Sequence, residues 1–338
     1  MIVEMKTGAS QEEVDGVVEK ARSLELGVQL NLGTDKVVVA LLGSNTGQIP
    51  TDIFAVLPGV ESVTRIMKPY KLASREFRPR DTRFSVGGVK VGGERVVVIA
   101  GPCAVESEKQ LMEAAEAVKK AGATVLRGGA FKPRTSPFSF QGLQKKGLEL
   151  LARAREQFGM PVVTEVVNPQ DVELVASYAD MLQVGSRNMQ NFALLTNAGK
   201  SRRPVVLKRG FSCTITEWLL AADYLLAGGN NEVILCERGI RTFEDSVRFS
   251  LDISAIPVLK KNSHLPVFVD PSHAAGHYSL VPAIAKAAVA AGADGLLIEV
   301  HPNPKEALVD GLQSLTLENF SALMEELRPI AAAVGRSI

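Results

Sequence analysis

The chain has 338 residues, enough for one large domain or for a large and a small domain together. Its 38 Lys and Arg residues nearly balance its 37 Asp and Glu residues, which excludes a general attraction to nucleic acid or to membranes. Any basic binding site must therefore be local.

The cysteines and the apolar stretches predict a cytoplasmic protein. Cys103, Cys213 and Cys236 cannot all pair with one another, and the N-terminus lacks the pattern of a signal peptide. The most apolar stretch, residues 281–300, is interrupted by Lys286 and Asp294. It therefore predicts a buried helix followed by a strand and not a membrane span.

Residues 1–67 carry the pattern of a separate small domain. A strand begins at Ile2, and Ser10 with Glu13 forms a capping-box pattern before a helix that we expect to end at Gly27. Further strands are expected at residues 28–32, 37–42 and 60–66, with a short helix at residues 51–57. This βαββαβ order predicts a ferredoxin-like fold, which often serves ligand sensing or dimerisation.

The next two segments join this small domain to the rest of the chain. Residues 68–82 are rich in Lys, Arg and Pro without periodicity, so we interpret them as a linker. Residues 84–98 contain two glycine pairs and resemble a β-hairpin that leads into a core strand.

Residues 83–338 then alternate short apolar runs with helical stretches such as 107–121 and 280–291. The candidate strands are residues 96–100, 124–127, 161–164, 181–184, 205–208, 232–236, 267–270 and 295–299. Eight βα units predict a TIM barrel, in which the active site lies at the carboxyl ends of the strands. A doubly wound open sheet is the alternative, but none of the runs has the short, polar character of an edge strand.

Cations gather at these predicted strand ends. They are Arg127, Lys132, Arg134, Arg187, Lys208 and Arg238. Each one alone could pair with a structural carboxylate, but so many like charges at one end of a barrel destabilise one another without an anionic ligand. The pattern therefore predicts a site for phosphate or carboxylate groups.

A second set of strand-end residues offers one sulfur, one nitrogen and two carboxylate donors: Cys103, His273, Glu299 and Asp310. Such a set suits a divalent Mn, Fe, Co or Zn ion. Because the four are scattered in the sequence, a buried cysteine and a hydrogen-bonded histidine stay an open alternative. His277 and His301 are alternative ligands, and we expect Cys236 to pack inside its strand.

Together the motifs resemble 3-deoxy-D-arabino-heptulosonate 7-phosphate (DAHP) synthase, in the subfamily with an N-terminal ferredoxin-like domain. The motifs are Gly101-Pro102-Cys103, Leu126-Arg127-Gly128-Gly129, Lys132-Pro133-Arg134-Thr135-Ser136-Pro137, Gly185-Ser186-Arg187-Asn188, Leu207-Lys208-Arg209-Gly210, Cys236-Glu237-Arg238-Gly239, Asp270-Pro271-Ser272-His273 and Glu299-Val300-His301-Pro302. The resemblance implies a condensation of phosphoenolpyruvate with erythrose 4-phosphate that releases phosphate and opens the shikimate pathway.

The resemblance also implies a role for each matching residue. Phosphoenolpyruvate would be held by Arg127, Lys132, Arg187, Lys208 and Arg238. Erythrose 4-phosphate would be held by Arg134, Thr135, Ser136 and Asp270, and the metal by Cys103, His273, Glu299 and Asp310. Lys132 would act as the acid for the developing alkoxide, and we expect neighbouring cations to lower the pKa of Lys132.

Regulation and assembly follow from the same resemblance. The N-terminal ferredoxin-like (ACT-like) domain would bind an aromatic amino acid, Tyr or Phe, as a feedback inhibitor, and the enzyme would be a homotetramer. A purely stabilising or dimerising role is the simpler alternative.

Three other functions remain to be weighed. 3-Deoxy-D-manno-octulosonate 8-phosphate synthase uses arabinose 5-phosphate on a similar barrel, but it resembles a Lys-Ala-Asn-Arg-Ser pattern where this chain has Pro-Arg-Thr-Ser. A class II aldolase needs a histidine-rich metal site, and this chain has only four histidines. An inactive barrel kept as a sensor would have lost a ligand or a phosphate-binding cation, and none is missing from the sequence.

Overall fold

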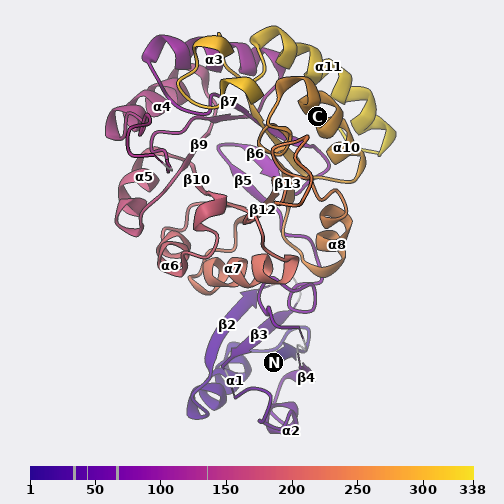
Figure 1. Ribbon diagram of the computed structural model, residues 1–338. Helices are drawn as coiled ribbons and strands as arrows, with labels where there is room; N and C mark the ends of the chain where they lie inside the picture. The colour runs from indigo at the N-terminus through magenta and orange to yellow at the C-terminus, as the bar shows by residue number, and fades with distance from the viewer. Residues whose placement is uncertain (33–35, 44, 66–67, 135) are drawn as a thin grey trace. The chain divides into compact units, whose positions relative to one another are not determined.

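The computed structural model describes residues 1–32, 36–43, 45–65, 68–134 and 136–338. It divides into two compact units, Met1–Pro79 and Arg80–Ile338 (Figure 1). Among the helices in these ranges, none combines the length and the apolar character needed to cross a lipid bilayer.

The first unit is a four-stranded antiparallel sheet with two helices. Its elements are β1 (Ile2–Met5), α1 (Gln11–Ser23), β2 (Gly27–Leu32), β3 (Val37–Leu42), α2 (Asp52–Ala55) and β4 (Val60–Thr64). The strand order β2-β3-β1-β4 places the first strand between the third and the fourth, as the ferredoxin-like plan requires. The predicted fold of this unit is therefore confirmed.

Helix α1 shows how local sequence builds this unit. The Ser10 side chain accepts from the Glu13 backbone while Glu13 caps the Ser10 N–H, so the predicted capping box is confirmed. The expected end at Gly27 was wrong, because the helix stops at Ser23 and the chain turns through Glu25, whose φ is 57°. Gly27 instead begins β2.

The edges of the predicted elements in this unit also shift. β4 ends at Thr64, and the expected last residue of that strand, Ile66, lies outside the described residues. Residues 68–79 count with the first unit and form hydrogen-bonded turns, for example from the Ser74 N–H to the Lys71 carbonyl and from the Phe77 N–H to the Ser74 carbonyl.

The second unit contains a closed barrel of parallel strands surrounded by helices (Figure 1). The strands are β7 (Val97–Gly101), β8 (Val125–Arg127), β9 (Val162–Glu165), β10 (Met181–Val184), β11 (Val205–Lys208), β12 (Val233–Glu237), β13 (Val267–Val269) and β14 (Gly295–Glu299). The helices include α3 (Glu108–Ala121), α4 (Lys145–Phe158), α5 (Val172–Tyr178), α6 (Phe192–Lys200), α7 (Ile215–Ala227), α8 (Ala255–Asn262), α9 (Pro271–Ala275), α10 (Val281–Ala290) and α11 (Leu317–Ala333).

Pairing of the last strand with the first decides between the two predicted architectures. β14 pairs with β7 in parallel from Gly295 opposite Val97 to Glu299 opposite Gly101. The sheet therefore has no edges, and the TIM barrel is confirmed over the open sheet.

A β-hairpin closes the amino end of this barrel. Its strands, β5 (Phe84–Val86) and β6 (Val89–Val91), bury Val86 and Val91 against the side chains of the barrel interior. A Cβ added at Gly87 would lie 3.0 Å from Pro161, which directly precedes β9, so the hairpin sits at the start of the strands. With this end sealed, a ligand reaches the barrel through the opposite end.

Phe268 provides a test of how the interior is packed. The ring is fully buried, and Phe268→Ala is expected to reduce the free energy of unfolding of the barrel by about 3–5 kcal/mol because it leaves a cavity. Urea unfolding followed by fluorescence of Trp218, the single Trp and fully buried in α7, measures this change. Phe243→Ala, at a fully exposed position, is the matched control. Equal unfolding curves for the two variants would contradict the packing described.

Candidate active site

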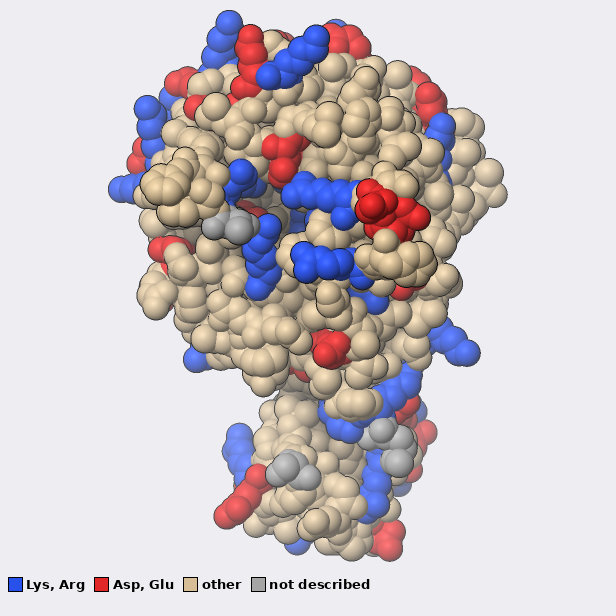
Figure 2. All heavy atoms as spheres, viewed as in Figure 1, with Lys and Arg blue, Asp and Glu red and all other residues tan. Residues whose placement is uncertain are grey.

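A pocket of about 310 Å³ opens at the carboxyl ends of the barrel strands. Figure 2 shows it as a recess bordered by Lys and Arg side chains on one face of the barrel. The cations that line it are Arg127, Lys132, Arg134, Arg187, Lys208, Arg238 and Arg248. The structure thus gathers in one cavity all the cations that the sequence placed at strand ends.

The four predicted metal-binding residues lie together beside these cations. Cys103, His273, Glu299 and Asp310 each offer one donor atom, and the four atoms lie within 4.8 Å of one another. The Cys103 Sγ is 3.3 Å from Asp310 Oδ2, and the His273 Nε2 is 3.4 Å from Glu299 Oε1. A soft sulfur, an imidazole nitrogen and two carboxylate oxygens at this spacing fit a divalent transition metal.

Asp270 fixes the imidazole of His273 for such a role. The Asp270 carboxylate caps the start of α9 by accepting from the His273 N–H at 2.9 Å, and it contacts His273 Nδ1 at 2.7 Å. This contact occupies Nδ1 and leaves Nε2 facing the cluster, as is usual for a metal-binding histidine. Burial lowers the pKa of His273, so the ring is neutral at pH 7.

Glycine lets the Cys103 loop approach β8. Gly101 has φ 146°, and a Cβ there would lie 2.2 Å from the Arg127 carbonyl oxygen. Burial raises the pKa of the Cys103 thiol, and the nearby Glu299 acts in the same direction. Lys132 and Arg127 lower the pKa of Cys103 but do not outweigh these effects, so a thiolate at this position needs further positive charge, which a bound divalent metal would supply.

Glu299 stays ionised although it is fully buried. Burial alone would raise the pKa of Glu299, but His273 and Arg127 lower it well below its usual range. The Arg127 guanidinium donates to Glu299 Oε1 at 2.8 Å, and both side chains are buried. A charge-assisted bond of this kind holds each group in one orientation.

Lys132 contacts the cysteine of the same cluster. Its ammonium donates to the backbone oxygen and to the sulfur of Cys103, both at 3.1 Å. The lowered pKa expected for this lysine was wrong. Burial does lower the pKa of Lys132, but its interactions with Cys103, Glu165 and Glu299 together raise the pKa above its usual value. Lys132 is therefore protonated at pH 7.

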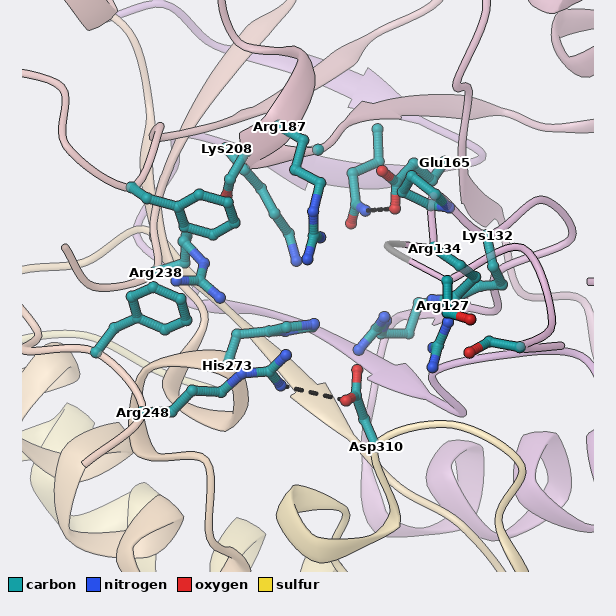
Figure 3. A pocket seen from close by; sticks show the side chains of 18 residues that line it. Arg127, Lys132, Arg134, Glu165, Arg187, Lys208, Arg238, Arg248, His273 and Asp310 are labelled. Carbon is teal, nitrogen blue, oxygen red and sulfur yellow. Dashed lines mark hydrogen bonds and ion pairs between the residues drawn. The ribbon is translucent and has the colours of Figure 1, made fainter. Parts of the chain in front are cut away.

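Aromatic rings hold a second group of cations. In Figure 3, Arg187 and Lys208 point side by side into the pocket, and Arg238 points toward the same space. The Arg238 guanidinium lies 3.9 Å from the Phe249 ring centroid and 4.9 Å from that of Phe211. Burial lowers the pKa of Arg238 to about 10, so it keeps its charge at pH 7.

Arg134 and Ser136 line the pocket across from these rings, as Figure 3 shows for Arg134. Thr135, expected beside them, lies outside the described residues. Asp270, expected to contact the sugar phosphate, is fully buried, and it contacts Lys208 Nζ at 2.5 Å and His273. His273 and Lys208 lower the pKa of Asp270 well below its usual value despite its burial.

The two alternative histidine ligands lie outside the four-residue cluster. His301 Nε2 faces Glu106 Oε2 at 3.3 Å, and its Nδ1 accepts from the Asn303 N–H. His277 is bonded through Nδ1 to Ser279. Cys236 is buried among the side chains of the barrel interior, which confirms the packing expected for it.

Sequence reasoning missed the residues that lie in loops well beyond the strand ends. Arg248, from the loop after β12, lines the pocket and donates to Asp310 Oδ1 at 3.2 Å. Gln313, in the turn after Asp310, donates to Glu299 Oε2 at 2.6 Å. Neither residue stands in a motif or at a strand end, so no local signal marks it.

The sequence of this chain matches two known families. Residues 74–333 match the DAHP synthetase I family, and residues 1–68 match the DAHP synthase ferredoxin-like domain. Phospho-2-dehydro-3-deoxyheptonate aldolase of Thermotoga maritima is 50% identical over 335 residues, covering 99% of each chain. 2-Dehydro-3-deoxyphosphooctonate aldolase of Geotalea uraniireducens is 33% identical over 274 residues, covering 74% of this chain and 98% of that protein.

Two solved structures extend the similarity to three dimensions. The crystal structure of the Thermotoga maritima DAHP synthase has a TM-score of 0.79 at 50% identity and covers 99% of this chain and 98% of that one. A truncated form of the enzyme from the same organism has a TM-score of 0.74 at 49% identity and covers 79% of this chain and 98% of that one.

Proposed function

The chain belongs to the DAHP synthetase I family, and on this premise we propose how its pocket carries out the reaction. It is a 3-deoxy-7-phosphoheptulonate synthase, which condenses phosphoenolpyruvate with D-erythrose 4-phosphate and water to give DAHP and phosphate at the first step of the shikimate pathway. The observation that carries the residue assignments is a single pocket that joins a cationic wall to a Cys-His-Glu-Asp cluster.

The cationic wall is proposed to hold phosphoenolpyruvate. Arg187 and Arg238 face aromatic rings, so they offer their charge to the phosphate. Arg127 and Lys132 lie beside the four-residue cluster and would take the carboxylate, and Lys208 lines the same pocket. Donors fixed in advance in this way stabilise developing charge without reorganising.

Erythrose 4-phosphate is proposed to bind at the opposite wall. Arg134 and Ser136 line that wall, and Thr135 joins them in the Pro-Arg-Thr-Ser motif. The loop that bears them begins directly after Lys132, so both phosphorylated substrates meet at one loop. The surrounding cations offset the repulsion between two anions that must approach within reacting distance.

Cys103, His273, Glu299 and Asp310 would hold a divalent metal, Mn, Fe, Co or Zn. When bound, such an ion supplies Lewis-acid polarisation of the aldehyde of erythrose 4-phosphate. Cys103 and His273 thereby count among the catalytic residues together with Lys132.

We propose the following bond changes for substrates held in this way. C3 of phosphoenolpyruvate attacks the aldehyde carbon, and Lys132, protonated at pH 7, gives a proton to the developing alkoxide. Water adds to C2 and gives up a proton, which balances the one given by Lys132. The C2–O bond to phosphate then breaks, the C2 hydroxyl becomes the ketone, and its proton leaves with inorganic phosphate. Arg187 and Arg238 stabilise the charge on the departing phosphate.

The octulosonate enzymes, which represent the alternative function, align with only part of this chain. The Geotalea uraniireducens protein covers 74% of it, whereas the Thermotoga maritima enzyme covers 99% at higher identity. The heptulosonate reaction is therefore favoured, in agreement with the Pro-Arg-Thr-Ser motif.

The N-terminal domain is proposed to confer feedback inhibition by Tyr or Phe within a homotetramer. The support is the match of residues 1–68 to the DAHP synthase ferredoxin-like domain.

We also propose a cytoplasmic location, because the three cysteines are unpaired, as is usual in a reducing compartment.

Phosphate release from phosphoenolpyruvate and erythrose 4-phosphate tests the catalytic proposal. Lys132→Met is expected to lower turnover at least about 100-fold, because the proton donor is lost. Lys145→Met, at an exposed position on α4, should keep the wild-type rate. Chelator should abolish activity and Mn²⁺ restore it. Near-normal turnover of Lys132→Met would remove the residue from the mechanism, and a faster reaction with arabinose 5-phosphate would favour the alternative.

Deletion of residues 1–70 tests the regulatory proposal. The shortened enzyme is expected to keep its turnover and lose inhibition by Tyr or Phe, because Arg80–Ile338 is a compact unit that contains the whole pocket. Steady-state rates with and without each amino acid measure this loss. Unchanged inhibition after deletion would place the effector site in the barrel.

A further inference from the structure

The carboxylates of the four-residue cluster are themselves held by two side chains from outside it. Arg248 contacts Asp310, and Gln313 contacts Glu299. Arg248 and Gln313 also contact each other, because the Arg248 guanidinium donates to Gln313 Oε1 at 2.6 Å. The four side chains therefore form one continuous chain of hydrogen bonds from the pocket wall to a buried strand end.

A tight turn places Asp310 and Gln313 side by side. Asp310 has φ 52° and directly precedes the 3₁₀ turn Gly311–Gln313. The Gln313 N–H donates to the Asp310 carbonyl at 3.3 Å, and residues three apart in such a turn lie on one face. One guanidinium can therefore reach both side chains.

Gln313 is suited to fix Glu299. Its side chain is buried, its amide nitrogen donates to Glu299 Oε2 at 2.6 Å, and its amide oxygen accepts from Arg248. Oε1, the other oxygen of Glu299, faces Arg127 and His273. Gln313 thus occupies the oxygen of Glu299 other than the one that faces His273, a member of the cluster.

Arg248 is suited to fix the carboxylate of Asp310 in the same way. It bonds to Oδ1, whereas Oδ2 faces the Cys103 sulfur (Figure 3 shows the bond to Asp310). Its backbone N–H donates to the Ala275 carbonyl at the end of α9, the helix that carries His273. A Cβ at Gly276 would lie 2.4 Å from the Arg248 Cβ, so the residue at position 276 must be small for this contact.

We infer that Arg248 and Gln313 are positioning residues that make each carboxylate of the cluster present a single oxygen to a metal ion. The inference rests on the proposed metal site. Arg248 occupies Asp310 Oδ1 and Gln313 occupies Glu299 Oε2, so a rotation that would make either carboxylate bind through both oxygens breaks a hydrogen bond. Partners of this kind orient metal ligands and raise metal affinity.

Arg248 also lines the pocket, so a direct contact with a substrate anion is the competing role. The two roles differ in a measurement made without substrates. A positioning residue changes the affinity for the metal alone, whereas a substrate-binding cation changes only the KM of a phosphorylated substrate.

The test is a titration of Co²⁺ into the metal-free, full-length protein. Gln313→Met and Arg248→Met keep side-chain bulk and remove the hydrogen bonds. Each is expected to weaken Co²⁺ binding roughly tenfold or more by calorimetry and to alter the near-ultraviolet charge-transfer band between Cys103 and Co²⁺. Arg241→Met, at an exposed position in the same loop, is the matched control and should bind Co²⁺ as the wild type does. Far-ultraviolet circular dichroism checks that each variant is folded.

The possible results distinguish a failure of the positioning role from a failure of the proposed metal site. If the wild type binds Co²⁺ through Cys103 and both variants bind it equally well, Arg248 and Gln313 are not positioning residues. If the wild type shows no thiolate band, the metal site fails and the inference fails with it. Because Arg248 is partly exposed, its variant keeps the test decisive should Gln313→Met fail to fold.

Discussion

Two buried carboxylates, at the ends of β13 and β14, must keep their negative charge for the site to form. Asp270 and Glu299 are both fully buried and both ionised, and an uncompensated carboxylate in such a place is strongly destabilising. Asp270 is paired with Lys208 and hydrogen-bonded to His273, and Glu299 is paired with Arg127. The same interactions that stabilise these buried charges also orient Lys208, His273 and Arg127.

Other cations of the pocket are held by a different means. The Arg238 guanidinium packs against the rings of Phe211 and Phe249, which stack on each other at 5.0 Å. An aromatic face holds a guanidinium without supplying a full negative charge, so Arg238 stays available to an anion. Arg127, in contrast, is paired with Glu299. The pocket therefore combines a cation that orients Glu299, one of the residues proposed to bind the metal, with cations left open to an anionic ligand.

Most residues of the pocket could be predicted from the sequence, because a parallel barrel brings the ends of all its strands to one face. Residues that end successive apolar runs, such as Cys103, Arg187 and Glu299, meet at one face whenever the runs are parallel barrel strands. Gln313 and Arg248 could not be found in this way, because their position depends on a 3₁₀ turn and on a loop that docks on α9. The direction of the pKa shift of Lys132 could not be predicted from the neighbouring cations alone, because Cys103, Glu165 and Glu299 also act on Lys132 and raise its pKa.

The proposed mechanism requires one pocket to hold a metal ion and phosphoenolpyruvate at the same time. An anomalous-difference map from crystals grown with Mn²⁺ and phosphoenolpyruvate would locate both. We expect one strong peak in contact with Cys103, His273, Glu299 and Asp310, and phosphate density against Arg187 and Arg238. A Mn²⁺ peak elsewhere on the barrel, or phosphoenolpyruvate bound away from these arginines, would contradict it.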